Sequence, residues 1–125
     1  MKTVRNFRDL TVWQKAMTFA EHVYGILRTF PVEERYGLCE QLHRAVVSIP
    51  SNIAEGHGRD SKKEYARFLF VAKGSLNETI TQLELACRLG YLKSGSGLYE
   101  ESAEIGKMLN ALIRSLRTPP PNPTP

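Results

Sequence analysis

The sequence predicts an all-α protein, an antiparallel up-down-up-down four-helix bundle, and three observations support this fold class. Apolar residues recur with helical spacing in four long segments, and no segment shows the alternating pattern of a strand. The connections between the segments are short, which favours antiparallel neighbours. The 125 residues suffice for one domain with a core but not for two. We therefore expect a single bundle over residues 1–117.

The first predicted helix covers residues 9–29. Asp9 is placed to cap its N-terminus by accepting a backbone N–H bond. Pro31 disfavours helical geometry in Phe30, so the helix should end just before it. The apolar positions with helical spacing, which should share one face, are Trp13, Ala16, Met17, Ala20, Val23, Tyr24 and Leu27.

The second predicted helix covers residues 32–56. Glu33 and Glu34 suit the positive end of a helix dipole at its start. Pro50 removes one N–H donor inside the helix, but the apolar period continues past it, so we expect a kink near Pro50 rather than two helices. The apolar stripe is Leu38, Leu42, Ala45, Val46, Ile49 and Ile53.

The third predicted helix covers residues 61–89. A capping box, in which Ser61 and Glu64 satisfy each other's backbone N–H groups, should start it, and Gly90 is a natural left-handed stop. Gly74 lowers the helix propensity at its middle, and we expect close approach of a neighbouring helix to be the reason. The expected core face is Tyr65, Phe68, Leu69, Ala72, Leu76, Ile80, Leu83 and Cys87.

The fourth predicted helix covers residues 98–116, after a Gly-Ser connector. Residues 118–125 contain five prolines, which exclude a helix and predict a solvated, extended, disordered tail. The inward residues of the fourth helix should be Ile105, Met108, Leu109, Leu112, Ile113 and Leu116.

Composition excludes several classes of protein. No apolar run is long enough for a membrane span, and the N-terminus lacks the apolar segment of a signal peptide, so we expect a cytoplasmic protein with no membrane partner. Cys39 and Cys87 are too far apart for a zinc or redox motif, so no cofactor is expected. The net charge of +4 permits a nucleic-acid partner without requiring one.

The histidines do not predict an active site. His22 and His43 lie in different helices without a Glu-x-x-His partner, so no metal site is expected. The Glu55–Ser61 turn gathers an acid, His57, Arg59 and a hydroxyl, but catalytic groups usually converge from separate elements. We therefore expect no catalytic residues, and an enzyme that uses the His57 turn remains an alternative.

A basic set around the start of the third helix is the candidate nucleic-acid interface. Lys62 and Lys63 occupy a first turn, where the helix dipole disfavours cations and an anion such as phosphate would bind well. The candidate phosphate-binding residues are Arg44, Arg59, Lys62, Lys63, Arg67 and Lys73. A solvated basic face, or contact with a protein partner, would account for the same residues.

Apolar residues outnumber those that the inward stripes need. Val71 and Leu89 do not fit the inward stripe of the third helix, and Val12 crowds the start of the first. A wide apolar surface on a small bundle favours association, and self-association is the simpler interpretation. The candidate oligomer interface is Phe7, Leu10, Phe70 and Leu85.

Two blocks of the sequence resemble the bacterial four-helix-bundle family of 23S rRNA intervening-sequence proteins. The blocks are FRDLTVWQKA at residues 7–16 and VSIPSNIAEG at residues 47–56, with shorter matches at Tyr36-Gly37-Leu38, Gly74-Ser75-Leu76 and Leu89-Gly90-Tyr91-Leu92. The resemblance covers about residues 5–117. It implies a helical bundle in a ring-like homo-oligomer, a homopentamer, without enzymatic activity. The family is also similar to the accessory protein of diversity-generating retroelements, which acts with a reverse transcriptase and binds nucleic acid.

Together these observations predict a non-catalytic, homo-oligomeric bundle that binds RNA or DNA through phosphate contacts. Such binding should be sensitive to salt and weakly sequence-specific. The alternative is a protein–protein interaction scaffold or accessory factor, for example for a reverse transcriptase or a ribosome-associated partner, without direct nucleic-acid binding. The sequence does not select a particular nucleic acid, protein partner, genomic context or oligomer number.

Overall fold

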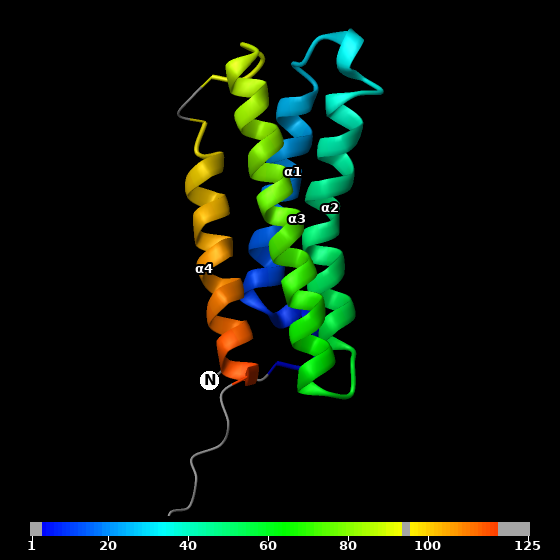
Figure 1. The fold of residues 1–125 in the computed structure, drawn as a ribbon, viewed down its shortest axis with the longest axis vertical. Helices are drawn as coiled ribbons and strands as arrows, with labels where there is room; N and C mark the ends of the chain where they lie inside the picture. Colours follow the sequence, from blue (N-terminus) through cyan, green and yellow to red (C-terminus); the bar gives the residue numbers. More distant parts are fainter. Residues whose placement is uncertain (1–3, 94–95, 118–125) are drawn as a thin grey trace, which may run out of the picture.

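The computed structural model describes residues 4–93 and 96–117, and it contains four long α-helices and two single-turn 3₁₀ helices (Figure 1). No strand occurs in these residues, so the predicted all-α four-helix fold is confirmed. The elements are η1 (Phe7–Asp9), α1 (Thr11–Leu27), η2 (Val32–Glu34), α2 (Leu38–His57), α3 (Lys62–Arg88) and α4 (Leu98–Arg117).

The four helices lie side by side along the long axis of the molecule (Figure 1). α3 packs against α2 and α4, and α1 closes the bundle by contacting the same two helices. The colours of Figure 1 show the chain rising along α1, descending along α2, rising along α3 and descending along α4. The starts of α1 and α3 and the ends of α2 and α4 therefore form one end of the bundle, which we call the lower end. The opposite end is the upper end.

The core is built from the apolar stripes of all four helices. The stripe predicted for α2 is buried throughout, as are Leu69, Leu76 and Leu83 of α3 and Ile105, Leu109 and Ile113 of α4. On α1 the prediction was partly wrong, because Met17 and Tyr24 are 38% and 41% exposed. The buried residues of α1 are Val12, Ala16, Phe19, Ala20, Val23 and Leu27, a stripe that passes beside Met17 and Tyr24.

The starts of α1 and α2 differ from the predictions. The Asp9 carboxylate does not cap α1 but accepts hydrogen bonds from the backbone N–H groups of Arg5 (2.8 Å) and Asn6 (3.4 Å), within η1. α2 begins at Leu38 rather than at residue 32, because the chain first forms the separate turn η2 and then bends at Gly37, whose φ and ψ are −110° and −106°.

The start and end of α3 follow local sequence signals closely. The Ser61 hydroxyl accepts a hydrogen bond from the Glu64 N–H group at 3.0 Å, but the reciprocal half of the predicted capping box is missing because the Glu64 carboxylate binds Arg67. Gly90 has a φ of +82° and ends the helix, as predicted, and its N–H group bonds to the Cys87 carbonyl at 3.0 Å.

Two predicted features have other outcomes. Gly74 does not mark a close helix contact, because it is exposed and a Cβ atom there would meet nothing within 4 Å. Instead Ser75 is buried and faces α2. α2 runs through Pro50 as one helix, and a kink there stays a prediction. The predicted tail at 118–125 lies outside the described residues.

Candidate nucleic-acid interface

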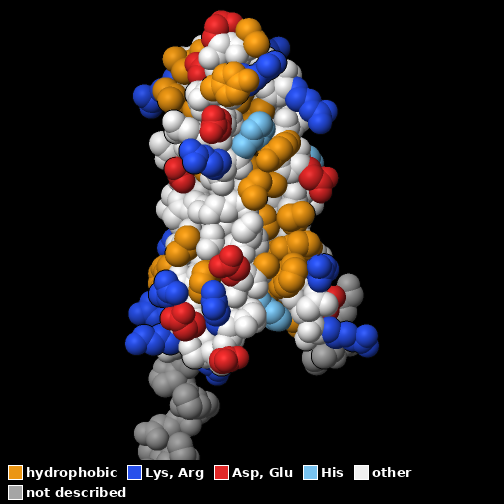
Figure 2. All heavy atoms as spheres, turned by 90° about the vertical axis from the view of Figure 1, so that its right-hand side faces the viewer, with side chains coloured by type: hydrophobic (Ala, Val, Ile, Leu, Met, Phe, Trp, Pro, Cys, Tyr) orange, Lys and Arg blue, Asp and Glu red, His pale blue; other side chains and the backbone are white. Residues whose placement is uncertain are grey.

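The lower end of the bundle carries most of the predicted basic set. The turn between α2 and α3 positions Arg59, and the first two turns of α3 position Lys62, Lys63 and Arg67. All four side chains are exposed. Figure 2 shows Lys and Arg side chains gathered at this end, with fewer acidic side chains among them. The structure therefore brings these four predicted residues together on one surface.

Gly56 explains why the turn before α3 is so tight. A Cβ atom at Gly56 would lie 2.8 Å from the Cβ atom of Phe68 and 3.1 Å from the Tyr65 carbonyl oxygen. Real Cβ atoms do not approach other atoms so closely, so only glycine lets α2 and α3 pack together here. This packing fixes where the basic residues of α3 stand relative to the end of α2.

Phe68 organises two of the arginines. The Arg59 guanidinium lies 4.7 Å from the centroid of the Phe68 ring, and the Arg67 guanidinium lies 5.0 Å from it. Both distances fit cation–π contacts, which orient the two guanidinium groups. An aromatic ring thus holds two exposed cations next to each other.

The charges of the lower end favour the binding of an anion. Arg67 binds Glu64 through two hydrogen bonds of 3.2 and 3.1 Å, and this hydrogen bonding lowers the pKa of the Glu64 carboxyl. Arg67 is therefore partly neutralised within the protein. Lys62 and Lys63 form no ion pair within residues 4–93 and 96–117, so their charges are available for a ligand.

Arg117 joins this surface from the last turn of α4. Its guanidinium lies 5.6 Å from the centroid of the Phe70 ring. An open hollow of about 480 Å³ separates the ends of α3 and α4, and we call it the lower hollow. It is lined by Lys62, Lys63, Glu64, Ala66, Arg67, Phe70, Leu116 and Arg117. Arg117 was not among the predicted residues, although a basic residue in the last turn of a helix is a recognisable signal.

Two predicted site residues lie elsewhere. Arg44 is in the upper half of α2, one turn above Ser48, and Lys73 lies on α3 one turn above Phe70, outside the lining of the lower hollow. The contact between Ser48 and Ser75 shows how the two helices align, and it places Arg44 and Lys73 on opposite sides of that contact along the bundle. Neither residue contributes to the surface at the lower end.

The histidines occupy unrelated positions. His22 Nδ1 lies 2.9 Å from Glu101, the His43 ring packs against Tyr24 at 4.2 Å, and the His57 ring meets Tyr65 edge-on at 5.7 Å. Within the described residues no three His, Cys, Asp or Glu side chains are placed to hold a metal ion. No hydrogen bond joins His57 to Ser61 in that part of the chain, and the Ser61 hydroxyl serves as the cap of α3.

The predicted oligomer interface divides into two groups. Phe70 and Leu85 are 44% and 47% exposed on the outer side of α3, where Val71 and Leu89 are also exposed. We call these four residues the outer stripe of α3. In contrast, Phe7 and Leu10 are half-buried, and the Phe7 ring packs edge-on against Trp13 with the centroids 5.3 Å apart. The structure thus brings together only part of this set.

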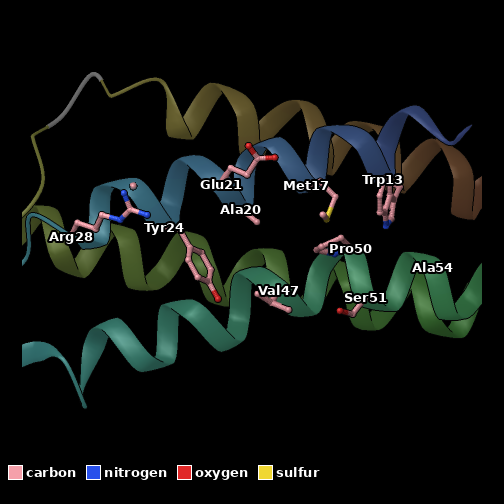
Figure 3. A pocket seen from close by; sticks show the side chains of 11 residues that line it. Trp13, Met17, Ala20, Glu21, Tyr24, Arg28, Val47, Pro50, Ser51 and Ala54 are labelled. Carbon is pink, nitrogen blue, oxygen red and sulfur yellow. The ribbon is translucent and has the colours of Figure 1, made fainter. Parts of the chain in front are cut away.

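An apolar groove between α1 and α2 was not predicted. It has a volume of about 760 Å³. Figure 3 shows Trp13, Met17 and Tyr24 of α1 facing Val47 and Pro50 of α2 across it. Figure 2 shows hydrophobic side chains running along this side of the molecule. The remaining lining residues are Ala20, Glu21, Gly25, Arg28, Ser51 and Ala54. Helical spacing predicted Met17 and Tyr24 as core residues, so the sequence did not reveal this groove.

None of the helices in the described residues is long and apolar enough to cross a membrane.

A family model described as 23S rRNA-intervening sequence protein matches residues 8–111. The fold is similar to the crystal structure of a protein with unknown function from the S23 ribosomal protein family of Bacteroides thetaiotaomicron, with a TM-score of 0.76 and 29% sequence identity. That match covers 83% of this chain and 99% of the other. No curated protein matches the sequence.

Proposed function

The chain belongs to the 23S rRNA-intervening sequence protein family, and from this membership we propose that it is a non-catalytic, homo-oligomeric protein that binds RNA or DNA through phosphate contacts. The binding surface is the lower end of the bundle. We place this function in the cytoplasm, where bacterial RNA and DNA are found. A named family does not by itself define a function, so the proposal depends on the chemistry of that surface.

The observation that carries the proposal is the lower hollow. Lys62, Lys63 and Arg117 come from two helices and surround a space whose single carboxylate, Glu64, is already bound to Arg67. Backbone N–H groups in the first turn of α3 add to the positive potential there. Flexible basic side chains contact phosphates without reading base edges, so the binding should depend on salt more than on sequence.

Self-association would strengthen this binding. The outer stripe of α3 and the α1–α2 groove are two apolar surfaces on different sides of the bundle, and either would lose water by contacting a second copy. A homopentamer, as the family resemblance implies, would carry about five times the +4 charge of one chain. Phe7 and Leu10 stay predicted members of the interface.

A salt titration tests the proposal. The protein is titrated against labelled single-stranded and double-stranded RNA and DNA at about 50 and about 200 mM salt, and binding should weaken strongly at the higher salt. Lys62→Glu combined with Lys63→Glu should weaken binding to every probe. Lys93→Glu combined with Lys107→Glu makes the same change in net charge away from the lower hollow and is the control. Equal losses in both double variants would refute the site, and no binding to any probe would refute the function.

The α1–α2 groove favours a second candidate function, a scaffold or accessory factor for another polypeptide. In that case apolar contacts would carry the binding, and salt would matter little. A reverse transcriptase or a ribosome-associated factor is the kind of partner we would test. Binding that is lost in Met17→Ala or Val47→Ala, which line the groove, but kept in the lysine double variant would favour this candidate over the first.

A further inference from the structure

A second hollow lies at the upper end of the bundle, where the end of α1, η2 and the start of α2 meet. It has a volume of about 560 Å³, and we call it the upper hollow. Its lining residues are Tyr24, Leu27, Arg28, Phe30, Pro31, Val32, Arg35, Cys39 and His43. None of these residues belongs to the lower hollow.

The floor of the upper hollow is apolar and rigid. Leu27, Phe30 and Cys39 are buried, and the Phe30 ring packs against Tyr91 with the centroids 5.5 Å apart. The Tyr91 hydroxyl donates a hydrogen bond to Glu34 at 2.9 Å, which ties η2 to the chain that follows α3. These contacts hold the floor in place, so the hollow is preformed and can accept a flat apolar group.

Two aromatic rings form a wall of the upper hollow. Tyr24 and His43 pack against each other with their centroids 4.2 Å apart and their planes tilted by 36°. Tyr24 also lines the α1–α2 groove, so its side chain borders both spaces. Paired rings of this kind offer a stacking surface to a flat ligand.

The charge on the upper hollow is positive. The side chains of Arg28 and Arg35 are exposed, and neither guanidinium group forms an ion pair or hydrogen bond in the part of the chain that the structure describes. The lining includes no carboxylate. A guanidinium group matches the oxygen atoms of a phosphate in a planar, two-bonded contact. The site therefore combines an apolar floor, aromatic rings and two unpaired arginines.

We propose that the upper hollow binds an unpaired nucleobase, which stacks on the Tyr24–His43 pair while Arg28 and Arg35 bind its flanking phosphates. This proposal rests on the proposed nucleic-acid function and adds a preference for single strands. A duplex cannot insert a paired base, whereas every unpaired base has a face that stacks on an aromatic ring. A simple anion would use the arginines but not the rings or the floor.

The test compares a labelled oligodeoxyadenosine strand with an abasic strand of the same length and phosphate number at low salt. The wild-type protein should bind the strand with bases more tightly, on the order of fivefold or more. His43→Ala and Arg35→Ala should remove or reduce this preference. His43→Phe should retain it, because it keeps a ring for stacking. Arg88→Ala removes a charge at the same end but outside the upper hollow. It should leave the preference for the strand with bases unchanged.

The outcomes separate this inference from the proposed function. Equal affinity of the wild-type protein for strands with and without bases would overturn the inference and leave phosphate binding intact. A preference that survives in both His43→Ala and Arg35→Ala would also overturn it. Failure to bind any strand, with circular dichroism showing folded protein, would overturn the proposed function and the inference together. Lys62→Glu with Lys63→Glu should lower the affinity for both strands without changing their ratio.

Discussion

The Ser75 hydroxyl of α3 donates a hydrogen bond to the Ser48 hydroxyl of α2, with the two oxygen atoms 2.8 Å apart. The same Ser48 oxygen accepts a second bond from Asn52 Nδ2 at 2.9 Å. These polar groups are partly or fully buried between the two helices. A directional contact at this place fixes how α2 and α3 align along the bundle, because sliding by one turn would leave buried hydroxyls unpaired.

Ser75→Ala should lower the free energy of unfolding by about 1 kcal/mol, because one buried hydrogen bond is lost. Ser48→Ala should cost a similar amount or more, since it also removes one of the two acceptors of Asn52 Nδ2 and leaves the Ser48 carbonyl oxygen as the other. Chemical denaturation of both variants and of the double variant measures the coupling between them. Strictly additive losses would contradict a direct bond between the two side chains.

Gly56→Ala should lower the free energy of unfolding by about 1 to 3 kcal/mol, because the added methyl group would push against Phe68 and the Tyr65 carbonyl. Gly74→Ala is the matched control. It lies inside a helix with open space around its Cβ position and should raise the stability by up to about 1 kcal/mol. Denaturation curves that show the same sign for both changes would contradict the packing described for Gly56.

The stability should fall as the pH rises above about 10, the usual pKa of tyrosine. Burial raises the pKa of Tyr65, so the folded state keeps a proton that the unfolded state has lost. The contribution of Tyr65 to the free energy of unfolding is therefore complete below that pH. It disappears as the pH rises through the folded-state pKa. Tyr65→Phe should flatten the fall measured by urea denaturation at several alkaline pH values. Tyr36→Phe, at an exposed position, should leave it unchanged.

Tyr65→Phe has a second expected effect, on the stability near neutral pH. The Tyr65 hydroxyl oxygen is buried and has no hydrogen-bond partner in the described residues. Removing an unpaired buried hydroxyl should leave the free energy of unfolding unchanged or raise it by about 1 kcal/mol. A clear loss of stability in Tyr65→Phe at neutral pH would show that the hydroxyl is bonded in solution.

Leu85→Glu should reduce the native mass measured by light scattering, because it places a charge in the outer stripe of α3. Ala111→Glu adds the same charge at an exposed position on α4 and should leave the mass unchanged. A wild-type protein that is monomeric at micromolar concentration would contradict self-association itself. An unchanged oligomer in Leu85→Glu and Phe70→Glu would contradict the role of this stripe.

Elements with strong local signals were predictable from the sequence. The boundaries of α3 were predicted within one residue, because Ser61 caps its start and Gly90 ends it through positive φ. All six residues predicted for the stripe of α2 are buried, and Cys39, Pro50 and Gly56 are buried beside them. The start of α2 was not predicted correctly, because Glu33 and Glu34 suit a 3₁₀ turn as well as an α-helix.

The candidate sites depended on tertiary packing and were less predictable. Lys62 and Lys63 are adjacent in the sequence, so their clustering was clear, but Arg117 reaches them only because α3 and α4 bring their ends together. The upper hollow combines residues of α1, η2 and α2, and no short motif unites Arg28, Arg35 and His43. Helical periodicity also cannot tell a residue in the core from one beside it, as Met17 and Tyr24 show.

The length of α3 sets a minimum size for a nucleic acid that contacts both hollows. Its 27 residues extend about 40 Å at 1.5 Å per residue, from the lower hollow to the upper end. With one phosphate per 3.4 Å along a single strand that keeps the base stacking of B-DNA, that span corresponds to about 12 nucleotides. Shorter probes would reach only one hollow of a given chain. Affinity measured against probe length should therefore rise in a step rather than gradually.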